Sequence, residues 1–258
     1  MRALRRRFGN SEQPVPMPTF AGLNIAPGPL YYDGNTYQIA DNWHPDSYGS
    51  TYGKNSGSYY FSIPNLSEYF SSRGSSTRYD IDNAGSKVTY KGKNDWRMGT
   101  YQEWYNIFYS RNGSTVNGTS SARYAIIKLA SGTISGDSNI YGGLLLFPDD
   151  VIISGKSLSG INGTTINSGV TASELQNYLD QGCRFLKTMG YYVTYNGGDW
   201  RKHTTVFSCW TTIHYSGNMY YDVHIAVDDE HYGTRVLCDD ISEGGYAFFP
   251  SYLVRTAI

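Results

Sequence analysis

Polar and aromatic side chains gather in the last quarter of the chain, at positions that we expect to face outward. They are Tyr195, Asn196, Asp199, Trp200, His203, His214, Tyr215, Asn218, Tyr220, Asp222, His224, His231 and Tyr232. Tyr and Trp offer rigid contact area, and Asn, His and Asp offer adaptable hydrogen bonds, so this composition is typical of a recognition surface. We predict a ligand-binding surface over residues 195 to 245, with strand pairing or a solvated loop as the alternative for each side chain.

The remaining chemistry-bearing residues match no catalytic pattern. The five histidines lack the i, i+4 spacing with a Glu that marks a helical zinc site. No Gly-x-Ser-x-Gly turn is present, and no glycine-rich phosphate-binding spacing follows a strand. We therefore predict a protein that is not an enzyme and holds no nucleotide cofactor.

Adjacent acidic residues raise the alternative of a calcium site. The pairs are Asp149-Asp150, Asp228-Asp229 and Asp239-Asp240. Calcium takes clustered carboxylate and carbonyl oxygens, but neighbouring residues seldom ligate one ion, and such pairs are more often turn residues. We predict no metal, with calcium as the alternative.

Three cysteines, Cys183, Cys209 and Cys238, have no Cys-x-x-Cys spacing, and at least one must stay unpaired. We predict no disulfide and expect each thiol to be a small buried hydrophobe.

A capped helix is predicted after Thr100. Thr100 and Glu103 have the spacing of a capping box, and Trp104, Ile107 and Phe108 follow on one helical face. Trp96 and Arg97 precede the cap, and we assign Trp96, Arg97, Trp104 and Trp210 to the scaffold.

A second capped helix is predicted after Thr171. Thr171 and Glu174 repeat the capping-box spacing before a second apolar stripe, and Gly182 is placed to end this helix.

Strand patterns surround these helices. The segments 124–129 and 142–148 are apolar runs, and the second is bounded by Gly and Pro, which predicts burial on both sides. Between Tyr220 and Val227, apolar and polar residues alternate, which predicts a strand with one buried and one solvent-facing side.

The stretch from Asp95 to Trp104 resembles the Trp-Arg-Leu-Pro-Thr-x-x-Glu-Trp signature of a family of C-type-lectin-like domains from gut Bacteroidetes and their phages. This family includes the variable proteins of diversity-generating retroelements. Gly99 stands where the family usually has Pro, which we expect to loosen the start of the helix. Further similarity at Leu30–Gly34, Val206–Thr212 and Tyr252–Arg255 extends the resemblance over about residues 22 to 258.

The resemblance implies an α+β, C-type-lectin-like fold with two amphipathic helices, mostly antiparallel short strands and long loops. It also implies that the last strand pairs beside the first, so that the termini are adjacent. In the diversified members of the family, variable positions lie in the late segment on a fixed scaffold.

Composition favours a single loop-rich domain. The chain has 258 residues, with 29 Gly, 25 Tyr and only 17% charged residues. We assign 21–258 to one domain and 1–20, which contains three prolines and an arginine run, to a flexible or oligomer-forming arm. The net charge of −1 excludes the basic footprint of a nucleic-acid partner.

The sequence shows neither a signal peptide nor an apolar run that could insert into a membrane. We expect a virion-associated or cell-surface adhesion protein that recognises a protein or glycan on a cell surface, with homo-oligomer formation as an option. The alternatives are a virion tail or surface-fibre component and a glycan-binding domain.

Overall fold

The computed structural model describes residues 17–41, 43, 53, 55–62, 66, 72–73, 80–81, 88–134, 139–194, 198–201, 205–216, 219–230, 232–243 and 247–257. Most of the predicted arm lies outside these residues. Its last part packs on the domain, because Phe20 is fully buried in the core and Asn24 donates to the carbonyls of Met17 and Pro18 at 3.3 and 3.1 Å.

The predicted α+β, C-type-lectin-like fold with two amphipathic helices is wrong, because the protein is mostly β. Strands make up 43% of it and helices 12%. Both predicted capping boxes do form, but the helices that follow are short: α2 (Tyr101–Tyr105) has 5 residues and α3 (Ala172–Asp180) has 9. A capping box fixes where a helix begins and not how far it runs.

The three longest strands, of 11 residues each, form one antiparallel sheet. They are β16 (Val206–Ser216), β17 (Met219–Asp229) and β18 (Gly233–Glu243), in that order. A second sheet has the order β12 (Ile166–Val170), β9 (Tyr124–Leu129), β10 (Gly142–Leu146) and β13 (Arg184–Lys187). β10 is buried along its whole length, as its apolar sequence predicts.

The first and last described strands are neighbours, as expected. In a third sheet β20 (Leu253–Thr256) pairs with β1 (Leu23–Ile25) on one side and with β6 (Arg97–Met98) on the other. The remaining strands form small sheets of two or three members. These are β11 (Ile152–Ile153) with β7 (Ser114–Val116) and β8 (Thr119–Ala122); β15 (Asp199–Arg201) with β14 (Tyr191–Val193) and β19 (Ala247–Phe248); β2 (Leu30–Tyr32) with β3 (Tyr37–Ile39); and β4 (Ser72–Arg73) with β5 (Asp80–Ile81).

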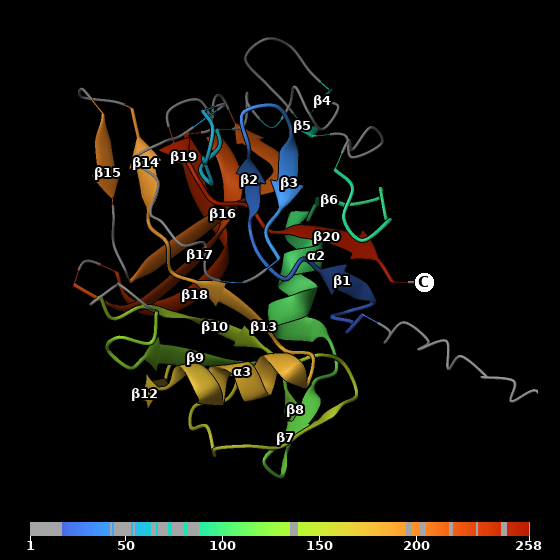
Figure 1. The fold of residues 1–258 in the computed structure, drawn as a ribbon, viewed down its shortest axis with the longest axis vertical. Coiled ribbons are helices and arrows are strands. Elements are labelled where there is room, and N and C mark those ends of the chain that lie inside the picture. Colours follow the sequence, from blue (N-terminus) through green and yellow to red (C-terminus); the bar gives the residue numbers. More distant parts are fainter. Residues whose placement is uncertain are drawn as a thin grey trace, which may run out of the picture.

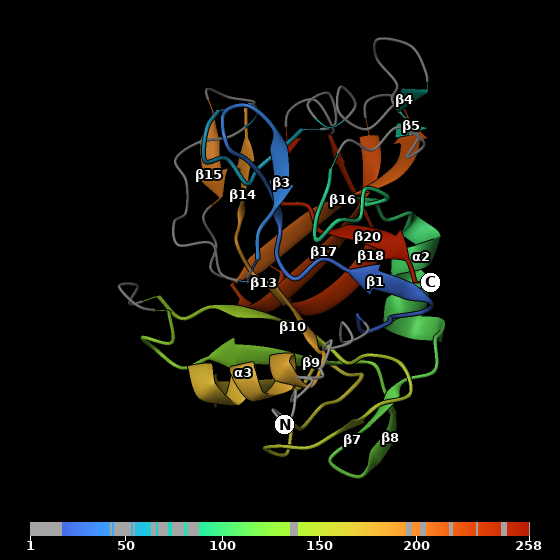
Figure 2. The same cartoon turned by 45° about the vertical axis from the view of Figure 1, so that its right-hand side comes forward.

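The long sheet β16–β18 runs through the middle of the molecule, with α2 alongside it (Figures 1 and 2). One end of the molecule, drawn at the top, carries β2, β3, β4, β5, β14 and β15. The opposite end carries α3 together with β7, β8 and β9. Within the described part of the chain, no helix is long and apolar enough to cross a membrane.

The start of α2 is fixed by local hydrogen bonds. Thr100 Oγ1 accepts from the Glu103 N–H at 3.1 Å, and Glu103 Oε2 accepts from the Thr100 N–H at 2.9 Å. Arg97 adds a bidentate ion pair, in which its two terminal nitrogens donate to the Glu103 carboxylate at 2.8 and 2.5 Å. The helix then continues as a π-helical turn over Asn106–Ser110 (η2).

Gly99 makes room for the ring of Trp104. A Cβ at this position would lie 2.5 Å from Trp104 Nε1, which is closer than nonbonded atoms approach. Trp104 is 1% exposed and is packed in the first core cluster. The glycine therefore permits close packing at the start of α2, where the sequence suggested only a looser backbone.

The two faces of the β16–β17 hairpin differ in chemistry, although both are buried. We call the side with Phe207, Cys209, Val223 and Ile225 the apolar face; it shares one core cluster with Trp104 of α2. We call the side with Ser208, Trp210, Asp222 and His224 the polar face. On this side Trp210 stacks on Phe249 with ring centroids 4.2 Å apart and belongs to a second core cluster that also contains Phe61 and residues of β2 and β3.

Candidate functional site

Five of the predicted ligand-binding residues lie outside the described residues. They are Tyr195, Asn196, His203, Asn218 and His231. For another five the structure gives the backbone position: Asp199 and Trp200 on β15, His214 and Tyr215 on β16, and Tyr220 on β17. Only Asp222, His224 and Tyr232 have described side chains.

The hairpins separate the predicted residues instead of forming one surface. His214 and Tyr220 are cross-strand partners beside the β16–β17 turn, whereas Tyr232 lies in the β17–β18 turn. Strands rise about 3.3 Å per residue, so the two turns lie roughly 30 Å apart along β17. The sequence prediction of a single continuous surface does not allow for this separation.

Asp222 and His224 do not face outward, which corrects the prediction for both residues. Asp222 is fully buried and His224 is 3% exposed. The alternation along β17 does place them opposite Val223 and Ile225, but the second core cluster around Trp210 and Phe249 covers their side of the sheet. A period of two shows which residues share a face and not whether that face meets water.

The assigned scaffold residues line the interior. Trp96, Trp104 and Trp210 are each at most 1% exposed, and Arg97 is partly buried in its ion pair with Glu103. The Trp210 indole N–H donates to the carbonyl of Phe61 at 2.8 Å, which ties β16 to a distant part of the chain.

The polar face ends in a partly exposed group at the β17–β18 turn, which we call the Tyr232 cluster: Tyr191, His224, Tyr232 and Arg235. The ring of buried His224 meets the ring of Tyr232 edge-on at 4.9 Å, and the Arg235 guanidinium lies 4.5 Å from the Tyr232 ring centre. The hydroxyls of Tyr191 and Tyr232 are 3.5 Å apart. Tyr232 thus contacts both a buried ring and a cation.

Three further contacts hold this cluster in place. Ser208 Oγ and His224 Nδ1 lie 3.1 Å apart, and both residues are buried. The backbone N–H of Tyr232 donates to Asp229 Oδ1 at 2.9 Å, and Thr205 Oγ1 donates to Asp229 Oδ2 at 2.5 Å. Asp229 therefore orders the turn that carries Tyr232. It acts as a turn residue, which was the alternative to calcium binding for the Asp228-Asp229 pair.

Tyr191 and Arg235 were missed from the sequence. Tyr191 begins β14, 41 residues before Tyr232, and no spacing links the two. Arg235 follows Tyr232 by three residues across the start of β18, so a hairpin with a defined register would have placed it nearby.

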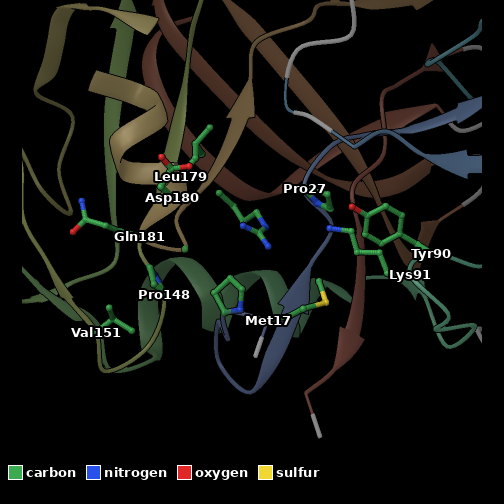
Figure 3. A pocket seen from close by; sticks show the side chains of 12 residues that line it. Met17, Pro27, Tyr90, Lys91, Pro148, Val151, Leu179, Asp180 and Gln181 are labelled. Carbon is green, nitrogen blue, oxygen red and sulfur yellow. The ribbon is translucent and has the colours of Figure 1, made fainter. Parts of the chain in front are cut away.

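A pocket of about 410 Å³ was also missed. It lies between the first described residues, the Tyr90–Lys91 turn and the end of α3 (Figure 3). Its lining includes the side chain of Arg184, the first residue of β13. Figure 3 shows the Lys91 amine and the Tyr90 hydroxyl pointing to the same side, beside Pro27.

The acidic pairs with described side chains take part in ion pairs. Asp149 accepts from Arg111 at 2.8 Å, and Asp228 accepts from Lys128 at 2.5 Å. Among the described residues, no three His, Cys, Asp or Glu side chains come together in a way that could hold a metal ion.

The three cysteines form no disulfide and are buried, as expected for small hydrophobes. Burial raises the pKa of the Cys183 and Cys209 thiols to about 12 in each case. A thiolate is the reactive form of cysteine. These two thiols therefore stay protonated near neutral pH and are poor nucleophiles.

Comparisons of this chain with protein-family models, with curated proteins and with solved structures found no match. The geometry that bears on function is therefore that of the Tyr232 cluster and of the pocket lined by Arg184, which we call the Arg184 pocket.

Proposed function

We propose that this chain is a non-enzymatic binding protein that recognises a protein or glycan on a cell surface, with the Tyr232 cluster as part of its binding surface. The observation that carries the proposal is the contact of the partly exposed Tyr232 with both the His224 ring and the Arg235 guanidinium.

Residue type supports this proposal. Tyr, Trp and Arg are enriched among the few residues that dominate binding energy at interfaces. The cluster brings two tyrosines and one arginine, all partly exposed, to one place. A guanidinium beside an aromatic ring can receive carboxylates or hydroxyl groups, while the ring packs on an apolar or sugar surface.

The fixed position of Tyr232 in the unbound protein also supports the proposed binding function. A side chain that is already fixed loses less conformational entropy on binding than a mobile one. The His224–Ser208 contact and the Asp229 turn hold Tyr232 from inside the domain. The cluster is therefore organised before a partner arrives.

The test is a binding screen of the labelled full chain against arrays of cell-surface glycans and surface proteins, followed by titration of any hit. Tyr232→Ala should weaken a true hit by at least about tenfold, which corresponds to roughly 1.4 kcal/mol. Tyr105→Ala is the matched control, because Tyr105 is a 38% exposed tyrosine on α2, which packs on the apolar face and not on the polar face that carries the cluster. Equal weakening by both variants, with unchanged melting temperatures, would remove the cluster from the binding surface.

A diversified origin is part of the same proposal and has its own test. The resemblance at Asp95–Trp104 leads us to expect a reverse transcriptase gene in the flanking DNA. We also expect a near-copy of the codons for residues 195 to 245 that differs mainly at template adenines. Finding both would give the positions that vary. Their absence would leave a recognition protein of fixed sequence.

An assembly component is the second candidate, favoured by a row of tyrosines on α2 and η2. Tyr101, Tyr105 and Tyr109 follow each other with ring centroids 6.1 and 5.1 Å apart, and Tyr105 and Tyr109 are 38% and 36% exposed. If this row joins subunits, Tyr105→Ala should dissociate an oligomer in sedimentation experiments and Tyr232→Ala should not. A monomeric wild-type chain would remove this candidate.

A further inference from the structure

Arg184 differs from the other partly or fully buried arginines near the core. Arg97 pairs with Glu103, Arg111 with Asp149 and Arg255 with Asp95, each with an N···O distance of 2.8 Å or less. Arg184 has no carboxylate partner among the described residues and donates instead to two backbone carbonyls, Ile25 O at 3.0 Å and Cys183 O at 3.1 Å.

The unpaired charge carries an electrostatic cost. Burial lowers the pKa of Arg184, and no carboxylate opposes that effect. In Arg97 the ion pair with Glu103 outweighs burial and raises the pKa, whereas in Arg111 burial still outweighs the pair with Asp149 and lowers it. Buried cations are normally paired, so a guanidinium that lines a pocket without an anion is a candidate for pairing with a ligand.

The end of α3 does not supply the missing anion. The carbonyls of Leu179 and Tyr178 in its last turn already accept from the Gly182 and Cys183 N–H groups at 2.9 and 3.1 Å. A helix C-terminus also carries only about half an elementary charge. Asp180 lines the pocket too, but its Oδ1 accepts from Gln176 at 2.8 Å, and it forms no ion pair with Arg184.

A second cation lies on the same pocket. Lys91 is exposed, lines the pocket and has its amine 5.3 Å from the centre of the Tyr90 ring. It occupies a two-residue turn with Gly92, in which both residues have positive φ, 48° and 72°, and Tyr90 and Lys93 exchange backbone hydrogen bonds. Such turns favour Asn followed by Gly, so lysine at this position is not explained by the turn.

The rest of the wall is largely apolar. It includes Met17, Pro27, Pro148 and Leu179, and the volume of about 410 Å³ falls in the range of small-molecule pockets. A guanidinium receives a carboxylate through two parallel hydrogen bonds. We propose that this pocket binds a small organic carboxylate, whose anionic group contacts Arg184 and Lys91 while its apolar body lies against the proline and methionine side chains.

A monoanion fits better than a phosphate monoester. Asp180 adds a negative charge to the lining, which repels a dianion more strongly than a singly charged group. The pocket shares no residue with the Tyr232 cluster, so this inference stands independently of the proposed function.

The experiment uses the full chain and ligand-observed saturation-transfer NMR. The probes are small carboxylates with apolar bodies, benzoate and hexanoate, each with its neutral amide, and phenyl phosphate as the dianion. At least one carboxylate should bind about tenfold or more tightly than its amide and more tightly than phenyl phosphate.

Three variants locate the site. Arg184→Gln should weaken carboxylate binding by about tenfold or more, because a charged hydrogen-bonding partner is lost. Lys91→Asn should weaken it by a smaller factor, and this change suits the turn, so the fold is kept. Lys93→Asn is the matched control on the same turn and should bind as the wild type does, because Lys93 is not part of the pocket lining.

Several results would overturn the inference: no carboxylate binding, equal binding of carboxylate and amide, or tighter binding of phenyl phosphate. The inference would also be overturned if Lys91→Asn and a folded Arg184→Gln both bound the carboxylate as tightly as the wild type. If Arg184→Gln fails to fold, a weakened Lys91→Asn with an intact Lys93→Asn still supports the site, and an unweakened Lys91→Asn overturns it.

Discussion

The two faces of the β16–β17 hairpin are equally buried but have different chemistry. The apolar face packs Phe207, Val223 and Ile225 against the core cluster that includes Trp104 of α2. The polar face buries Ser208 and His224 beneath the second core cluster, which contains Trp210, and extends to the partly exposed Tyr232. Both faces should therefore contribute to stability, and the orientation of surface groups should depend on the second.

The largest expected effect is Trp104→Ala on the apolar side. Trp104 is 1% exposed, so its removal leaves a large cavity, and we expect a loss of about 3–5 kcal/mol in the free energy of unfolding. Urea denaturation followed by circular dichroism measures it. Tyr105→Ala, one residue along α2 and 38% exposed, should cost far less. Similar losses in the two variants would show that the buried face of α2 has been wrongly assigned.

Gly99→Ala should have the next largest effect. The new Cβ would lie 2.5 Å from Trp104 Nε1 in a packed site, and overpacking of this kind costs about 1–3 kcal/mol. Gly163→Ala is the control, because its nearest neighbour, the Gly160 carbonyl oxygen, is 3.4 Å away. Melting temperatures of the pair measure the difference. A Gly99→Ala protein as stable as Gly163→Ala would mean that the indole can shift.

How far the sequence could predict this structure depends on whether a feature is local. The Thr100 and Thr171 capping boxes, the buried stripe of α2 and the buried strand β10 were predicted, because their determinants lie within a few residues of one another. The α+β class was wrong because capping says nothing about helix length, and the chain has far more residues in strands than in helices.

The candidate site and the pocket could not be predicted, because both are formed by contacts between segments that are distant in the sequence. The alternation along β17 correctly placed Val223 and His224 on opposite faces of the strand. The second core cluster, which covers His224, includes residues from distant parts of the chain. The Arg184 pocket is similar, since its lining brings together Met17, Lys91, Pro148 and the end of α3. No motif joins these segments, so only the folded chain reveals them.

A reciprocal exchange of neighbouring residues tests the two faces directly. Ser208→Cys should remove the contact with His224 Nδ1 on the polar face, and Cys209→Ser should place a hydroxyl among apolar neighbours. Each change is nearly isosteric, so loss of the hydrogen bond or burial of an unpaired hydroxyl should dominate, at about 1–2 kcal/mol each. Chemical denaturation gives both values. If either change were neutral, the corresponding face would not have the chemistry assigned to it.

The smallest effect concerns the cap of the helix on the apolar face. Burial raises the pKa of the Glu103 carboxyl, but the hydrogen bonds from Arg97 and the Thr100 N–H together outweigh it, so the pKa lies below its ordinary value of 4.5. A depressed folded-state pKa gives stability that is fully present above about pH 4.5 and is lost as the pH falls through the folded value.

Glu103→Gln should therefore lower stability at neutral pH by about 1 kcal/mol and flatten the acid dependence below about pH 4.5. The Glu174→Gln variant tests the other capping box, where the backbone hydrogen bond from Thr171 lowers the pKa but the side chains are more exposed. Denaturation curves between pH 7 and pH 3 should show a smaller change for Glu174→Gln. Equal changes in the two variants would mean that the Arg97–Glu103 pair adds nothing beyond an ordinary cap, and that the packing of Trp104 alone holds α2 on the sheet.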